Sequence, residues 1–249
     1  MAKSSIEWTE VTWNPTTGCD QTSPGCDNCY AMTMAKRLKA MGQPKYQADG
    51  DSRTSGPGFA LTLHPDTLAD PLRWRNSRLV FVNSMSDLFH PDVPDDFIAR
   101  VFEVMNDTPQ HTYQVLTKRA NRLQRSSDQF DWPQNLWLGV SVETQRYAFR
   151  AECLRHIPVP VRFVSAEPLL GPLDLDLSGI DWLIVGGESG PGARQMEARW
   201  AESLRDASLD LDTAFFFKQW GGRTPKAGGR TLGGRLWDEM PTPRARLAS

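Results

Sequence analysis

Short apolar runs alternate with polar or amphipathic stretches along nearly the whole chain. Eight such runs are rich in β-branched and aromatic residues, a composition typical of buried strands. They lie at residues 11–14, 59–63, 79–83, 112–116, 136–140, 161–165, 182–185 and 214–218. The pattern therefore predicts eight strands.

The stretches between the runs predict helices at residues 31–41, 67–74, 94–105, 119–126, 145–157 and 197–208. The third is the best defined, because Pro94 suits the first helical position and Asp95 and Asp96 suit the first turn. Strands that alternate with helices, and are apolar throughout, are typical of a parallel sheet. We therefore expect an α/β fold, a parallel (β/α) barrel over residues 1–218 that is either a complete eight-stranded barrel or partly open.

The tail, residues 219–249, follows the last predicted strand. Two of its Gly-Gly pairs, Gly221-Gly222 and Gly233-Gly234, lie among apolar residues and favour a hairpin that folds back over the barrel mouth as a cap. The alternative is a terminal extension that is only partly ordered.

Three cysteines lie directly after the first predicted strand, Cys19, Cys26 and Cys29, with the spacing C-x6-C-x2-C. Thiolates this close on one loop can bind a soft metal centre, either zinc or an iron–sulfur cluster. A closed zinc site needs a fourth ligand, for which Asp20, Asp27 or one of the four histidines are the candidates, and no histidine has a suitable spacing. Cys153 lies far away in a predicted helix, where a buried structural thiol is expected.

Composition excludes several classes of protein. The chain has 249 residues, 39% of them hydrophobic, and a formal net charge of −2, so its bulk charge does not favour polyanion binding. Four cysteines are too few for a secreted disulfide scaffold. Neither a signal peptide nor a membrane span is evident, and we expect a cytoplasmic protein without a membrane partner.

Polar residues follow most of the predicted strands, where a parallel barrel carries its functional face. Each of them could instead mark the exit of a buried strand. They are Ser84, Ser86, Asp87, Lys118, Glu143, Glu167, Glu188 and Lys218.

The three-cysteine loop after a first strand, followed by repeated strand–helix units, resembles the radical S-adenosylmethionine superfamily. More narrowly, the chain is similar to a three-cysteine family of bacterial and phage proteins placed near that superfamily. The similarity runs from about Trp8 to Pro241 and rests on the strings TWNPTTGC, SPGCDNCYA, VFVNSMSDLF, VLTKR, GVSVE, SAEPLLGP, IVGGESG and FFFKQWGG.

The resemblance implies a [4Fe–4S] cluster bound by Cys19, Cys26 and Cys29, whose open iron binds S-adenosylmethionine. Such an enzyme releases a 5′-deoxyadenosyl radical that abstracts hydrogen from a substrate, here unidentified. It also implies an electron donor such as a flavodoxin or a ferredoxin.

The superfamily's Gly-Gly-Glu segment normally follows the second strand, whereas Gly186-Gly187-Glu188 follows the seventh run here. We therefore assign Ser84, Ser86 and Asp87 to the methionyl amine and ribose, Lys118 to the carboxylate and Glu143 to a ribose hydroxyl. Glu167, Glu188 and Lys218 are candidate catalytic residues, as substrate contacts or proton carriers. Their alternative role is a ring of salt bridges at the strand ends.

Two basic stretches raise nucleic acid as a further partner, although a solvated helix face is the commoner explanation. They comprise Lys118, Arg119, Arg122 and Arg125, and in the tail Arg223, Lys226, Arg230 and Arg235. Two other classes of protein stay open, a non-catalytic barrel stabilised by zinc that serves as a binding module, and an iron–sulfur electron carrier.

Overall fold

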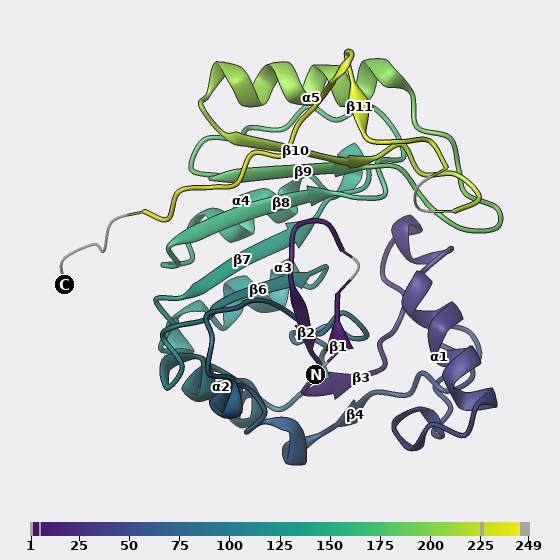
Figure 1. Ribbon diagram of the computed structural model, residues 1–249, viewed down its shortest axis with the longest axis vertical. Coiled ribbons are helices and arrows are strands. Elements are labelled where there is room, and N and C mark those ends of the chain that lie inside the picture. The colour runs from purple at the N-terminus through teal and green to yellow at the C-terminus, as the bar shows by residue number, and fades with distance from the viewer. Residues whose placement is uncertain (1, 5, 225–226, 245–249) are drawn as a thin grey trace. The chain divides into compact units, whose positions relative to one another are not determined.

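The main sheet is built from the apolar runs of the sequence. In the computed structural model, which describes residues 2–4, 6–224 and 227–244, seven parallel strands with interleaved helices form a partial (β/α) barrel (Figure 1). An eighth strand, β1, pairs antiparallel with β2. The order is β1 (Ala2–Lys3), β2 (Val11–Trp13), β5 (Leu79–Val82), β6 (Thr112–Thr117), β7 (Leu136–Ser141), β8 (Val161–Ala166), β9 (Trp182–Gly186) and β10 (Ala214–Gln219). Of the two arrangements expected, the partly open barrel is confirmed.

The second apolar run, residues 59–63, does not enter this sheet, and its prediction as a barrel strand was wrong. Only β4 (Thr62–Leu63) is extended, and it pairs antiparallel with β3 (Thr16–Thr17). Phe59 is instead buried beside Ala31 and Ala35, so its apolar surface is used in packing against a helix.

Five α-helices lie close to their predicted places: α1 (Tyr30–Ala40), α2 (Asp95–Asn106), α3 (Ala120–Arg125), α4 (Phe149–Arg155) and α5 (Ala198–Asp210). Pro94 is the N-cap of α2 and not its first helical residue. The helix predicted at residues 67–74 is wrong, because Pro71 interrupts it and only the 3-10 turns η3 (Pro65–Thr67) and η4 (Pro71–Arg73) form.

The remaining 3-10 turns are η1 (Pro24–Cys26), η2 (Pro44–Tyr46), η5 (Ser127–Gln129) and η6 (Gln145–Tyr147). The last of them replaces the first turn of the helix predicted at residues 145–157.

The chain separates into two compact units. The first comprises Met1–Thr22 and Cys29–Trp137, and the second comprises Ser23–Asn28 and Leu138–Ser249. The short piece Ser23–Asn28, here called the Cys26 segment, thus belongs to the second unit although its neighbours in the sequence belong to the first.

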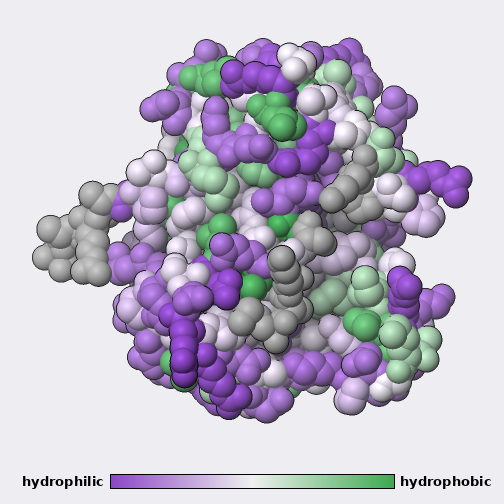
Figure 2. Space-filling view, in the orientation of Figure 1, coloured by the Kyte–Doolittle hydropathy of each residue, from purple (hydrophilic) through white to green (hydrophobic). Residues whose placement is uncertain are grey.

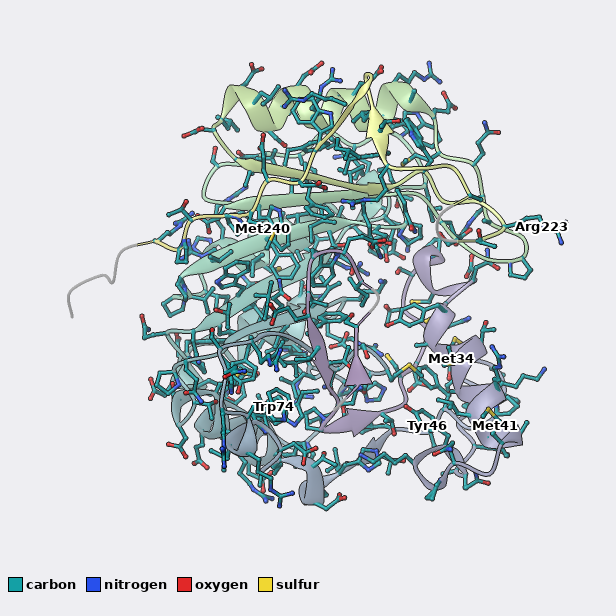
Figure 3. All side chains as sticks on the ribbon, in the orientation of Figure 1. Met34, Met41, Tyr46, Trp74, Arg223 and Met240 are labelled. Carbon is teal, nitrogen blue, oxygen red and sulfur yellow. The ribbon has the colours of Figure 1, made fainter. Side chains whose placement is uncertain are left out.

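In the first unit, α1 packs its alanine face on a small apolar cluster with Phe59 and Met85. Met34 of α1 and Met41, directly after the helix, are exposed, and apolar surface gathers over this helix (Figure 2). Met34 and Met41 point outward from it, with Tyr46 of η2 beside the helix (Figure 3).

In the second unit, α5 lies along β9 and β10 (Figure 1). The tail returns beside β10, where the Phe217 amide donates to the Trp237 carbonyl at 2.9 Å. It contains the hairpin of β11 (Thr231–Leu232) and β12 (Arg235–Leu236). Residues 225–226 and 245–249, Lys226 among them, lie outside the described residues, and a cap over the barrel mouth stays a prediction.

No helix in the described ranges has both the length and the apolar character that a membrane crossing requires.

Candidate functional site

All four cysteines lie in the described residues and are thiols, not disulfides. Cys19, Cys26 and Cys29 are half-buried, whereas Cys153 is buried in α4, where burial raises the pKa of its thiol. The three-cysteine loop therefore carries the accessible thiols, as a metal-ligand set requires.

The first unit fixes the start of the cysteine loop at Gly18. Its backbone has φ +86°, and a β-carbon there would lie 2.0 Å from the Ala60 carbonyl oxygen, so only glycine fits. The Gly18 amide donates to the Met85 carbonyl at 3.0 Å, and the Ser86 hydroxyl donates to the Gly18 carbonyl at 2.6 Å. Ser86, predicted to bind the cofactor, is thus in contact with the loop itself.

Asp20, next to the first cysteine, is held by side chains from distant parts of the first unit. Thr54 Oγ1 donates to Asp20 Oδ1 at 2.6 Å, and His90 Nε2 lies 3.0 Å from Asp20 Oδ2. Burial raises the pKa of Asp20, but these hydrogen bonds outweigh it and leave the pKa below its ordinary value. Asp20 is therefore a carboxylate that anchors the loop.

Arg119 brings a positive charge to the first cysteine. Its Nη2 donates to the Asp20 carbonyl at 3.0 Å and lies 3.8 Å from Cys19 Sγ. A guanidinium at this distance stabilises a thiolate.

The other predicted cofactor residues of the first unit lie at the ends of β5 and β6. Asp87 is buried and accepts hydrogen bonds from the Phe89 amide, the Thr117 hydroxyl and the Lys118 amide. Ser84 donates to Asn14 Oδ1 at 3.2 Å. Lys118 is half-buried directly after β6.

In the second unit, Glu143 follows β7 and is completely buried. Its two carboxylate oxygens have different partners, because Ser23 Oγ donates to Oε1 at 2.7 Å and Arg150 Nη1 donates to Oε2 at 3.0 Å. Arg150 is 2% exposed and stacks on Tyr147, with its guanidinium carbon 4.2 Å from the ring centroid. Glu143 is thus in contact with the Cys26 segment.

Glu188 follows β9 and is 5% exposed. Arg194 binds it with two side-chain nitrogens, at 2.9 Å to Oε2 and 2.5 Å to Oε1, and with its backbone amide at 2.9 Å. Asn28 Nδ2 donates to the same carboxylate at 2.9 Å. Burial raises the pKa of Glu188, but these donors outweigh it and hold the pKa below its ordinary value.

The last two predicted catalytic residues form an ion pair. Lys218 Nζ lies 2.5 Å from Glu167 Oε1, and both side chains are partly exposed, at 16% and 19%. A proton carrier needs such access to solvent or substrate. Glu167 and Lys218, predicted as separate catalytic candidates, are thus in contact with each other.

Sequence reasoning missed the residues that hold the loop, namely Ser23, Asn28, Thr54, His90, Arg150 and Arg194. One signal is present in the loop sequence. Asp20, Ser23 and Asn28 are polar, and polar side chains that are removed from water require hydrogen-bond partners in the protein. Their partners are too distant in the sequence to be assigned from it.

Arg122 and Arg230, from the two predicted basic stretches, make internal contacts. Arg122 donates to the carbonyls of His90 and Val93 and pairs with Asp95 at 2.5 Å. In the tail, Arg230 donates to the Lys218 carbonyl at 3.0 Å. These guanidinium groups are structural links within each unit.

The donor set of the loop fits an iron–sulfur cluster. Three half-buried thiols lie within one loop, and Ser23 Oγ is 3.9 Å from Cys26 Sγ, so polar hydrogens lie near the sulfur atoms. The described part of the chain has no three His, Cys, Asp or Glu side chains grouped closely enough to share one metal ion.

Fold and loop define the class: an open (β/α) barrel protein with a three-cysteine loop after its first parallel strand. The chain belongs to the family described as "Protein of unknown function (DUF5131)", which it matches over residues 3–241. No curated protein matches it.

Among solved structures, the fold is similar to that of spore photoproduct lyase. A tyrosine-to-phenylalanine mutant of that enzyme gives a TM-score of 0.54 at 10% identity and covers 88% of this chain and 78% of the other. A cysteine-to-serine mutant gives 0.52 at 11% identity, with coverages of 88% and 79%. In a further structure, a complex with dinucleoside spore photoproduct, this chain spans 63% of the lyase and the TM-score is 0.49. At these identities the likeness shows the fold.

Proposed function

We propose that this protein is a radical S-adenosylmethionine enzyme that uses a [4Fe–4S] cluster on Cys19, Cys26 and Cys29. The observation that carries the proposal is the set of three half-buried thiols on one loop, which follows the first parallel strand of an open (β/α) barrel. The likeness of the fold to spore photoproduct lyase supports it.

When bound, the cluster and S-adenosylmethionine supply an electron and a 5′-deoxyadenosyl radical that abstracts hydrogen from an unidentified substrate. The three thiolates bind irons, and Arg119 stabilises the charge at Cys19 through its Nη2 at 3.8 Å. Lys118 is the cation assigned to the methionyl carboxylate. Asp87, with three protein donors, fixes the backbone from which Lys118 extends.

Glu167 and Lys218 are the residues assigned to the substrate. Both are partly exposed and lie 2.5 Å apart, so one bound molecule could contact both side chains. Ser84, Ser86 and Glu143 hold protein groups in this structure, so any contact they make with the cofactor uses their remaining lone pairs.

The proposal includes an electron donor such as a flavodoxin or a ferredoxin. It also places the protein in a reducing cytoplasm, where the thiols of the loop stay reduced.

The experiment is anaerobic reconstitution with iron and sulfide, followed by metal and sulfide assays, dithionite reduction and a search for 5′-deoxyadenosine. The intact chain and Cys153→Ala should each bind about four irons with matching sulfide, and Cys26→Ala should not. Cys153→Ala is the matched control, because this thiol is buried in α4 and is not part of the three-cysteine loop.

Two results would contradict the proposal. One zinc per chain without sulfide would indicate a zinc-stabilised module. A cluster whose electron paramagnetic resonance spectrum does not change when S-adenosylmethionine is added would indicate an electron carrier.

A further inference from the structure

The Cys26 segment has little regular structure of its own. It consists of the 3-10 turn η1, in which the Cys26 amide donates to the Ser23 carbonyl at 2.8 Å and the Asp27 amide to the Pro24 carbonyl at 3.3 Å. One such turn is not stable in isolation. Its conformation must therefore come from contacts with the rest of the second unit.

The first end of the segment is tied to a buried ion pair. Ser23 Oγ donates to Glu143, and the opposite oxygen of Glu143 accepts from Arg150. Arg150 also donates to the Ser141 carbonyl at 2.7 Å, so the pair is fixed to β7. Glu143 and Arg150 are 0% and 2% exposed, and a pair buried this deeply has no room to rearrange.

The other end is tied to a second ion pair. Asn28 donates to Glu188, and Arg194 reaches the segment twice, at 2.7 Å to the Pro24 carbonyl and at 3.1 Å to Asp27 Oδ2. Arg194 also donates two hydrogen bonds to the Glu188 carboxylate, from Nε to Oε2 and from Nη2 to Oε1.

The second ion pair is itself fixed by the sheet. The Gly187 amide donates to the Gln219 carbonyl and the Gly222 amide to the Glu188 carbonyl, each at 2.9 Å. A β-carbon at residue 187 would lie 2.0 Å from the Trp220 carbonyl oxygen, so only glycine allows this close approach. The backbone that carries Glu188 thus extends the β9–β10 pairing.

We propose that Glu143–Arg150 and Glu188–Arg194 are positioning ion pairs, which set the place of the Cys26 thiol by holding the two ends of the Cys26 segment. The inference rests on the proposed function only for the group that Cys26 binds. It assigns Glu188 to the support of the loop and not to proton transfer, because its oxygens accept four hydrogen bonds from Asn28 and Arg194.

The test uses the full chain without cofactor, in two measurements: amide hydrogen exchange of the Cys26 segment and alkylation of Cys26 by iodoacetamide. In Asn28→Ala and in Arg194→Ala, exchange at Cys26 and Asp27 and alkylation of Cys26 should become faster by about tenfold or more, because the segment opens more easily. Asn28→Ala removes only the hydrogen bonds of one half-buried side chain, to Glu188 at 2.9 Å and to the Gly192 carbonyl at 3.4 Å, so it keeps the test valid if Arg194→Ala does not fold.

The matched control is Arg155→Ala. Arg155 also donates to two backbone carbonyls, those of Ser178 and Asp176 at 2.7 and 2.8 Å, and lies away from the segment in the same unit. Its loss should leave exchange and alkylation at the segment unchanged.

Unchanged protection of the segment in both loop variants would overturn the proposal. Equally faster hydrogen exchange in every peptide of both variants would also overturn the proposal, since that result indicates a loss of stability throughout the protein. Because the protein carries no cofactor here, the answer does not depend on cluster binding. Iron content of the same variants after reconstitution then tests the proposed function separately.

Discussion

Gly25 faces the side chain of Glu143 so closely that a β-carbon at residue 25 would lie 2.5 Å from Glu143 Cγ and 2.6 Å from Oε1. The small residue is therefore required where the cysteine loop passes a buried carboxylate. A methyl group there would displace Glu143 from both Ser23 and Arg150.

We expect Gly25→Ala to lower the free energy of unfolding by about 1–3 kcal/mol, the usual cost of overpacking. Urea denaturation measures this. Gly171→Ala is the control, because a β-carbon at residue 171 meets no atom within 4 Å. Equal stability of the two variants would show that Glu143 moves aside without cost.

The ion pair of Glu143 and Arg150 gives a second prediction. Arg150→Met should lower the free energy of unfolding by about 3–5 kcal/mol, because it leaves the buried carboxylate without its partner. The double variant Glu143→Gln/Arg150→Met should be more stable than Arg150→Met alone, since it removes the stranded charge. A double variant less stable than the single one would speak against this account.

Glu188 gives a prediction for pH. Burial alone would raise its pKa, but the donors from Arg194 and Asn28 hold it below the ordinary value of 4.5. A lowered folded-state pKa contributes stability that is fully present above the unfolded pKa and is lost as the pH falls through the folded one.

Between pH 7 and 3, the wild-type chain should therefore lose more stability than Glu188→Gln, and the difference should appear below about pH 4.5. Thermal unfolding at a series of pH values measures it. Asp27, which also faces Arg194, keeps its charge contact in both proteins. If the stability of the two proteins falls equally with pH, Glu188 does not contribute to the pH dependence of stability.

The burial of the cysteines predicts their reactivity. In the cofactor-free chain, Cys19, Cys26 and Cys29 should each be alkylated about tenfold or more faster than Cys153, because Cys153 reacts only when α4 opens. Intact-mass spectrometry counts them. Reconstitution should protect the three fast thiols and leave the slow one as it was.

The tail gives a prediction for stability. Trp237 is 7% exposed and meets the Phe215 ring edge-on, with centroids 5.5 Å apart. Trp237→Ala should therefore lower the free energy of unfolding by about 3–5 kcal/mol. Met240→Ala is the control, because Met240 lies in the same tail and is 41% exposed.

Much of the barrel could be predicted from the sequence. The strands β7, β8 and β9 are buried at every residue, so each appears as a continuous apolar run. The run at residues 59–63 is equally apolar, but Phe59 packs beneath α1, a distinction that the sequence does not carry.

The sequence predicts where the candidate site residues lie along the strands better than it predicts what each side chain does. Glu143 and Glu188 do follow strands, as the pattern of a parallel barrel requires. Their partners determine what they do, and Arg194 is six residues beyond Glu188 in an irregular loop whose path the sequence does not reveal.

The anchors of the Cys26 segment lie far along the chain: Ser23 and Glu143 are 120 residues apart, and Pro24 and Arg194 are 170 residues apart. The thiols of the loop are therefore synthesised well before Glu143 and Arg194, the residues that fix the Cys26 segment. Since such long-range contacts form late, the nascent chain has no finished place for a metal centre. The Cys26 segment can accordingly reach its final position only after Arg194 has been synthesised.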